Sequence, residues 1–151
     1  MSKKIVLLGS TGSIGCSTLK VAQELPDEIQ IIALAAHQNT QKLAEQARAT
    51  GVKYVAIYEA NKVDELRSLL PNDVKIFSGP EGLIELSTLA DADTVLIAIV
   101  GTAGLQPALA AIHAGKDLES QILMLGFSSK NDSLESEFLE RVNPAWIIIL
   151  G

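Results

Sequence analysis

The sequence predicts an α/β protein, a doubly wound three-layer αβα sandwich with a mainly parallel sheet of about seven strands. Short apolar runs alternate with segments whose apolar residues recur at helical spacing, as strands and helices do in such folds. Hydrophobic residues make up 48% of the 151 residues and aromatic residues only 4%, which favours an aliphatic core of parallel strands covered by helices. The length of 151 residues suits one domain, and a glycine-rich segment directly follows the first apolar run, so residues 1–151 are predicted to form a single Rossmann-like domain.

The predicted strands are the apolar runs, most of which are continuously apolar, as strands buried on both faces are. Strands that are joined by helices run parallel and are linked by right-handed crossovers, so these runs are expected to share one sheet. They lie at residues 4–9, 29–36, 52–58, 74–79, 93–101, 121–127 and 145–150.

The predicted helices lie between these strands and show the i, i+3, i+4 spacing of an amphipathic helix. Asn39 or Thr40 can cap the second helix, and Gly115 can end the fifth. Asp132 or Ser133 can open the sixth. The helices are expected at residues 14–25, 43–47, 63–70, 83–89, 105–112 and 132–142.

Charge and cysteine content limit the partners and the compartment. The chain has 18 acidic and 12 basic residues and a net charge of -6, so neither nucleic acid nor an anionic membrane is an expected partner. A bound anion must then be held by local groups. The single cysteine, Cys16, excludes an internal disulfide and suits a reducing cytosol. Since the N-terminal apolar run is too short for a signal peptide, we expect a cytoplasmic protein.

The segment LLGSTGSIGCST, residues 7–18, is the strongest functional signal in the chain. Gly9, Gly12 and Gly15 form a variant of the dinucleotide-binding fingerprint at the turn from the first strand into the first helix. Gly9 is expected to make the tight turn, Gly12 to let a pyrophosphate approach the backbone, and Gly15 to let the helix pack closely. Hydroxyls that could donate to the phosphates come from Ser10, Thr11 and Ser13. The alternative is a glycine-rich loop that only turns a corner.

The end of the second strand indicates which dinucleotide is bound. NAD-binding domains commonly place an acidic residue there to accept hydrogen bonds from the ribose. This chain instead has His37, Gln38 and Asn39, which leave room for a 2′-phosphate and favour NADP. The alternative is that His37 is a solvated loop residue and Asn39 only a helix cap.

The end of the fifth strand is a further candidate part of the site. Gly101 and Gly104 flank a small polar residue, Thr102, at the carboxyl end of a strand near the expected switch in strand order. Gly101 and Thr102 are therefore candidate cofactor contacts. A plain tight turn would explain the same residues.

Two motifs carry a family resemblance, GSTGSIG at residues 9–15 and AIVGTAGLQP at residues 98–107. Together they resemble the amino-terminal NADPH-binding domain of 1-deoxy-D-xylulose 5-phosphate reductoisomerase, an enzyme of isoprenoid biosynthesis, over residues 4 to about 117. The resemblance implies that the loop at residues 37–39 faces the adenosine 2′-phosphate, where the family more often reads G-K-N or G-S-N. It also implies that the pyrophosphate and its ribose are lined by Thr11, Gly12, Ser13 and Ile14.

The resemblance ends before residues 118–151. The family's N-K-E motif, which reaches the substrate, and its D-S-E motif, which binds the metal, do not occur there. Ser129 and Lys130 could match the N-K-E motif only at a shifted position. This βαβ-like segment is faintly similar to the end of metallo-β-lactamase-type hydrolases, without their histidine pair. We therefore expect residues 118–151 to differ in evolutionary origin from the rest of the chain, as in an engineered chimera. We also expect the chain to have no metal site and no catalytic residues.

These observations favour a catalytically incomplete NADP(H)-binding domain. One alternative is a structural or engineered scaffold that binds no ligand. Another is a small stand-alone reductase that uses Lys130 or His113. A monomer is expected, although the apolar run at residues 145–150 could pair with a second chain as an edge strand.

Overall fold

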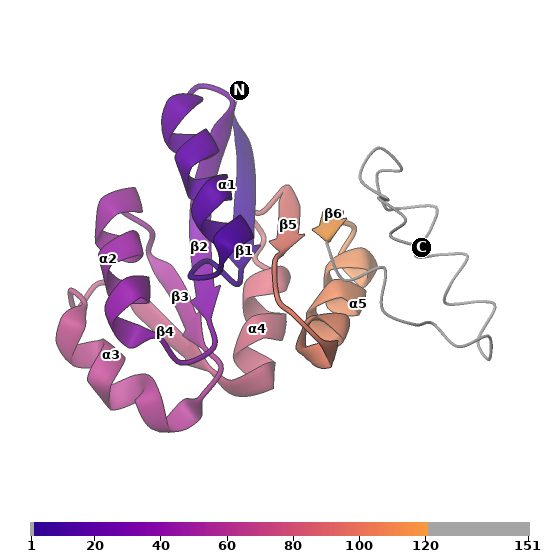
Figure 1. Ribbon diagram of the computed structural model, residues 1–151. Coiled ribbons are helices and arrows are strands. Elements are labelled where there is room, and N and C mark those ends of the chain that lie inside the picture. The colour runs from indigo at the N-terminus through magenta and orange to yellow at the C-terminus, as the bar shows by residue number, and fades with distance from the viewer. Residues whose placement is uncertain (1, 121–151) are drawn as a thin grey trace.

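A computed structural model describes residues 2–120 of the chain, in which strands and helices alternate (Figure 1). Two short 3-10 helices, Ala60–Lys62 and Thr102–Gly104, precede α3 and α5. The main elements are β1 (Lys3–Leu8), α1 (Ser13–Glu24), β2 (Ile29–Ala36), α2 (Thr40–Thr50), β3 (Tyr54–Ile57), α3 (Val63–Leu69), β4 (Lys75–Ser78), α4 (Gly79–Ser87), β5 (Thr94–Ile97), α5 (Leu105–His113) and β6 (Asp117–Ser120).

The strands form one parallel sheet in the order β4-β3-β2-β1-β5-β6. The strands β2, β3 and β4 are added in turn on one side of β1. The chain then crosses the sheet through α4, so that β5 lies on the other side of β1. The order of the strands therefore switches between β1 and β5, where ligands bind in doubly wound sheets. This arrangement confirms the predicted fold class.

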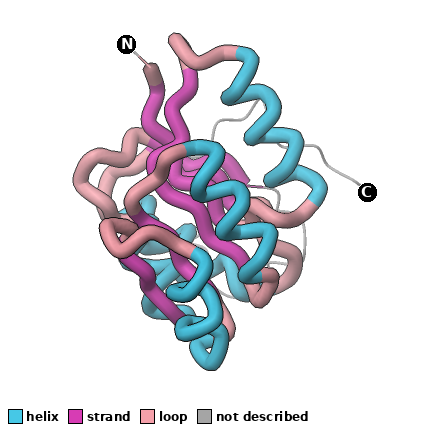
Figure 2. The backbone as a smooth tube through the Cα atoms, turned by 90° about the vertical axis from the view of Figure 1, so that its left-hand side faces the viewer, coloured by secondary structure: helices cyan, strands magenta, loops and turns pink. Residues whose placement is uncertain are grey.

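Helices cover both faces of this sheet, to either side of the strands (Figure 2). Val6 and Leu8 of β1 belong to a buried cluster with residues of α4 and α5. Ile5 and Leu7, which point the opposite way, belong to a second cluster with residues of α2 and α3. Since successive side chains of a strand alternate between faces, burial on both sides explains why β1 is continuously apolar.

The start of α2 and the end of α5 carry the residues that the sequence predicts for them. Asn39 caps α2, its side-chain oxygen accepting a hydrogen bond from the Lys42 backbone N–H at 3.1 Å. Gly115 follows α5 with a φ of 73°, the left-handed conformation that glycine adopts at helix ends.

The strand prediction misses one element of the described residues. They contain six strands where five were predicted, because β6 at Asp117–Ser120 is not among the predicted strands. This short edge strand is defined by backbone pairing with β5, where Thr94 aligns with Asp117, rather than by an apolar run. The elements predicted at residues 121–127, 132–142 and 145–150, and with them nearly all of the proposed foreign tail and the edge for dimer pairing, lie outside the described residues.

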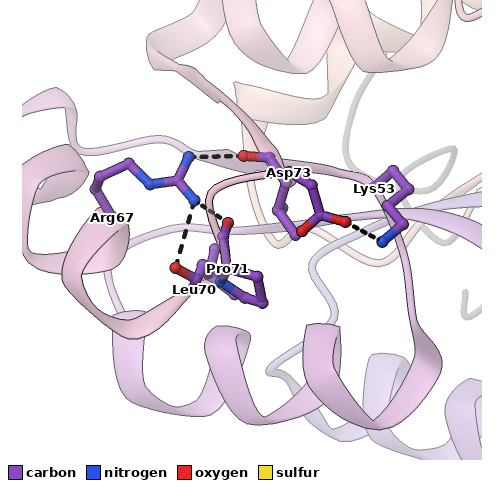
Figure 3. A network of polar contacts seen from close by, with 6 residues as sticks. Lys53, Arg67, Leu70, Pro71 and Asp73 are labelled. Carbon is purple, nitrogen blue, oxygen red and sulfur yellow. Dashed lines mark hydrogen bonds and ion pairs between the residues drawn. The ribbon is translucent and has the colours of Figure 1, made fainter.

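A network of polar contacts holds the connection from α3 to β4 (Figure 3). The Arg67 guanidinium donates to the backbone carbonyls of Val74 at 2.6 Å, Leu70 at 3.5 Å and Pro71. Beside it the exposed Lys53 and Asp73 form an ion pair at 2.5 Å, and Lys53 lowers the pKa of the Asp73 carboxyl. Arg67 thus supplies the donors that satisfy the carbonyls of this turn.

Replacing Arg67 with methionine is expected to lower the free energy of unfolding by about 2 kcal/mol, because carbonyls bonded to a charged donor lose their partner. The exposed Lys53–Asp73 pair provides the comparison, since Lys53→Met breaks an ion pair that solvent screens and is expected to cost much less than Arg67→Met. Urea denaturation followed by circular dichroism measures both changes. Equal effects of the two substitutions would contradict this role of Arg67.

Candidate functional site

A cavity of about 470 Å³ opens where β1, β2 and β5 end, at the switch in strand order. β5 stops at Ile97, whereas the sequence predicts a strand as far as residue 101. The residues that follow β5 leave the sheet and form one wall of the cavity. The lining residues are Gly9, Thr11, Gly12, Ala35, Ala36, His37, Tyr58, Leu83, Ala98, Ile99, Val100, Thr102 and Ala103.

The turn after β1 is held against the ends of both neighbouring strands. Gly9 has a φ of 88°, and a Cβ atom there would lie 2.4 Å from the Ala98 carbonyl oxygen. The backbone N–H groups of Gly9 and Ser10 both donate to the Ala35 carbonyl at 2.9 Å. Only glycine permits this conformation and this close approach, as expected of the first glycine of the fingerprint.

The other two glycines of the turn have different surroundings. At Gly15, which is buried in α1, a Cβ atom would lie 2.2 Å from the Gly9 carbonyl oxygen and 2.6 Å from the Ser10 Cα. The helix therefore packs directly on the turn. At the exposed Gly12 the nearest atom to such a Cβ is the Gly9 oxygen at 3.7 Å. The bare backbone of Gly12 is thus left open at the wall of the cavity.

The N-terminus of α1 has no capping side chain. Gly12 is the N-cap, and its carbonyl accepts the first helical hydrogen bond from the Cys16 N–H at 2.9 Å. The N–H groups of the first helical turn have no carbonyl one turn earlier to bond, and they lie at the positive end of the helix dipole. In contrast to the capped α2, α1 therefore presents free donors and partial positive charge, a suitable environment for a phosphate.

Side chains of α2 brace the turn from the other side. The Gln46 side-chain amide donates to the Ser10 carbonyl at 2.9 Å, and the Lys42 ammonium donates to the Thr11 carbonyl at 2.8 Å. The Cys16 thiol contacts the same two oxygens at 3.7 and 3.8 Å. Because the C=O and N–H of a trans peptide point in opposite directions, holding the Ser10 carbonyl toward α2 turns the Thr11 N–H away from α2.

Sequence reasoning missed both Lys42 and Gln46. Their spacing of one helical turn places them on the same face of α2, but nothing local in the sequence reveals what they contact. Their partners lie 31 and 36 residues away along the chain.

The cavity brings together only part of the predicted site. The Ser10 side chain is fully buried, and its hydroxyl has no partner among the described residues, so the hydroxyl donor expected there is not available to a ligand in the cavity. The predicted residues that line the cavity are Gly9, Thr11, Gly12, His37 and Thr102. Those that lie near it along the chain without lining it are Ser10, Ser13, Ile14, Gly15, Gln38, Asn39 and Gly101.

Two aromatic rings mark the end of the cavity at β2 and β3. The His37 and Tyr58 rings stack with centroids 5.1 Å apart and an interplanar angle of 19°. The His37 Nε2 lies 3.4 Å from a Glu59 carboxylate oxygen, and 61% of the His37 side chain is exposed. Asn39 caps α2, as one of the two sequence interpretations predicts. The stacked rings give this end of the cavity a flat surface.

The loop after β5 forms the opposite wall. Gly101 has φ 86° and ψ -156°, a backbone conformation that is essentially restricted to glycine. Val100 precedes it with 91% of its surface exposed, and Thr102 begins the 3-10 helix. His113, a candidate for stand-alone catalysis, lies exposed at the end of α5 and does not line this cavity.

Within residues 2–120 no group of three or more His, Cys, Asp or Glu side chains is placed to hold a metal ion. In the same part of the chain, no helix combines the length and the apolar character that a membrane crossing requires.

A family model described as 1-deoxy-D-xylulose 5-phosphate reductoisomerase matches residues 5–120, which is more than half of the chain. The chain belongs to this reductoisomerase family. The match extends through β6, slightly beyond the limit of about residue 117 inferred from the sequence motifs.

Curated reductoisomerases show the same relationship at the level of sequence. The Proteus mirabilis enzyme is 47% identical over 117 residues, which cover 76% of this chain and 30% of that protein. The Microcystis aeruginosa enzyme is 44% identical over 120 residues, with 77% and 30% covered. The chain thus spans about 30% of the length of these reductoisomerases.

Solved reductoisomerases share the fold. The Zymomonas mobilis enzyme in complex with NADPH matches with a TM-score of 0.75 and 35% identity, covering 81% of this chain and 32% of that chain. A reductoisomerase in complex with NADPH, fosmidomycin and magnesium matches with a TM-score of 0.76 and 31% identity, covering 92% and 34%. The described domain therefore corresponds to the part of a reductoisomerase that has the Rossmann-like fold.

Proposed function

We propose that this chain is the NADPH-binding part of a 1-deoxy-D-xylulose 5-phosphate reductoisomerase and binds the dinucleotide in the cavity between β1, β2 and β5. The observation that carries the proposal is the uncapped N-terminus of α1, which meets the cavity at Gly12. The chain has a net charge of -6, so a dinucleotide pyrophosphate must be held by local groups. The free N–H groups of α1 are such groups.

The surroundings of the turn support this placement of the pyrophosphate. Gly9 and Gly15 allow β1, the turn and α1 to pack tightly, while Gly12 adds no side chain where the phosphates would approach. The first helical turn, which includes Ser13 and Ile14, would provide backbone donors. In this proposal Ser10 acts through its buried backbone and not through its hydroxyl.

The two ends of the cavity fit the two ends of a dinucleotide. At β2, the stacked rings of His37 and Tyr58 offer a flat surface for the adenine, and the loop with Gln38 and Asn39 would border its ribose. At β5, Gly101 and Thr102 would border the nicotinamide half, since ligands of doubly wound domains cross the switch point. The NADPH in the Zymomonas mobilis reductoisomerase supports the choice of cofactor.

Titration calorimetry with NADPH and NADH tests this function. We expect the 151-residue chain to bind both cofactors in a 1:1 ratio, and NADPH more tightly. Absence of binding by either cofactor at millimolar concentration would overturn the proposal and favour a scaffold that binds no ligand.

We further propose that residues 1–151 alone bind the cofactor without catalysing the family's reaction. Hydride transfer requires a substrate held against the nicotinamide, and the N-K-E and D-S-E motifs expected to serve substrate and metal do not occur in these residues. The test is an assay for NADPH oxidation with 1-deoxy-D-xylulose 5-phosphate and magnesium. Turnover dependent on that substrate would contradict this part of the proposal.

A further inference from the structure

Lys42 contacts both the loop that follows β2 and the glycine turn that follows β1. It belongs to the first turn of α2, directly after the loop that follows β2, and its N–H is bonded to the Asn39 cap. Its side chain reaches back to the glycine turn, where the ammonium lies 2.8 Å from the carbonyl oxygen of Thr11, a residue that lines the cavity. The ammonium therefore lies beside a residue that lines the cavity, while Lys42 itself is not among the lining residues.

The charge of Lys42 is not neutralised by a carboxylate within the described part of the chain. An ammonium has three hydrogen-bond donors, and the recorded contact of Lys42 uses one of them on a neutral carbonyl. Two other basic side chains, in the segments after β2 and β3, face carboxylates: the His37 imidazole lies 3.4 Å from Glu59 and the Lys62 ammonium 2.9 Å from Glu65. Lys42 therefore has both charge and donors available for an anionic ligand.

The acidic groups beside α2 have other partners. The Thr40 hydroxyl and the Lys62 ammonium both bond the Glu65 carboxylate, and these contacts lower the pKa of Glu65. The Glu59 carboxylate, in the segment after β3, faces the His37 ring. The strand end at β2 itself carries no carboxylate that could accept hydrogen bonds from an unmodified ribose.

We propose that Lys42 is the residue that makes this site prefer NADPH to NADH, by binding the 2′-phosphate of the adenosine ribose. The inference rests on the proposed function, because it assumes that a dinucleotide occupies the cavity. In doubly wound domains the ribose 2′ position faces the end of β2, and a nearby cation accommodates the phosphate. Lys42 can bind this phosphate while keeping its contact with Thr11, since the two interactions use different protons of the ammonium.

The competing explanation is that Lys42 only positions the glycine turn. Gln46 provides the matched comparison, because it lies one helical turn later on α2 and holds the preceding carbonyl, that of Ser10, with a neutral side chain. A residue that only positions the turn affects NADPH and NADH alike. A residue that binds the 2′-phosphate affects NADPH alone, and its contribution weakens as salt screens the charge.

The experiment measures dissociation constants of NADPH and NADH for the wild type, Lys42→Met, Gln46→Met and Lys20→Met. We expect Lys42→Met to weaken NADPH about tenfold, equivalent to about 1.4 kcal/mol, and to change NADH by less than about twofold. Gln46→Met is expected to weaken both cofactors to the same extent. Lys20, an exposed lysine of α1 outside the cavity, controls for net charge and is expected to change neither.

Further measurements separate specificity from loss of folding. Circular dichroism and the thermal midpoint establish that each variant is folded, and Lys42→Arg is expected to retain the preference for NADPH. The wild-type preference should fall between about 50 and 500 mM salt, whereas that of Lys42→Met should not. Equal losses for NADPH and NADH in Lys42→Met, an unchanged preference, or no preference in the wild type would overturn the role of Lys42. Absence of binding by the wild type would instead overturn the proposed function itself.

Discussion

Replacing Gly15 with alanine is expected to destabilise the fold by about 3 kcal/mol or more, the largest effect on stability that we predict. The new Cβ would lie 2.2 Å from the Gly9 carbonyl oxygen and 2.6 Å from the Ser10 Cα and carbonyl carbon. All of these are backbone atoms of the turn, so no side chain can rotate to relieve the overlap. Urea denaturation followed by circular dichroism measures the loss, which would appear as a lower midpoint.

Gly51→Ala provides the control for Gly15→Ala. Gly51 ends α2 with a φ of 71°, but a Cβ there has no atom within 4 Å. Its substitution is expected to cost only about 1 kcal/mol, from backbone strain alone. If Gly15→Ala is no more destabilising than Gly51→Ala, the close packing of α1 on the glycine turn does not exist in solution.

Replacing Gly12 with valine is expected to weaken NADPH binding at least about 100-fold, or about 2.7 kcal/mol, while the fold remains intact. Gly12 has φ -76° and ψ 177°, extended backbone that valine readily adopts, and the nearest atom to its Cβ would be 3.7 Å away. The added methyl groups would occupy the space through which the pyrophosphate reaches the N-terminus of α1. Calorimetric titration measures the affinity, and urea denaturation the stability.

Gly12→Ala completes this test as a graded substitution. It adds one methyl group to the same wall of the cavity, so we expect an intermediate loss of affinity and only a small loss of stability, since alanine is a poorer N-cap than glycine. Unchanged NADPH affinity in both Gly12 variants would show that the pyrophosphate lies elsewhere. A large loss of stability in both would show that Gly12 supports the fold rather than the ligand.

The predictions from sequence succeeded where the signal is local and periodic. The strands β1 to β5 and the five helices α1 to α5 each combine an apolar pattern with end signals such as Asn39 and Gly115. The switch in strand order followed from the alternation of strands and helices. The exception, β6, lacks an apolar run of its own, because a short edge strand is defined by hydrogen bonds to its neighbour β5.

In the candidate site, too, the sequence predicted the local features and missed the contacts between distant residues. The glycine spacing at Gly9, Gly12 and Gly15 identified the turn, because the need for backbone without side chains is visible in the residue type itself. The spacing did not reveal which neighbours point into the cavity, and the hydroxyl of Ser10 proved to be buried. The His37–Tyr58 stack and the contact between His37 and Glu59 were likewise not predicted, since they join residues at the ends of two strands.

The sequence by itself determined the fold class, the place of the glycine turn and the family, because these depend on residue types at short spacing along the chain. Only the tertiary structure decided which groups meet at the cavity. Lys42 and Gln46 reach the glycine turn across 31 and 36 residues of chain. Such contacts depend on how α2 packs beside α1 on the sheet, and the packing of two helices is set by their whole buried faces rather than by any single residue.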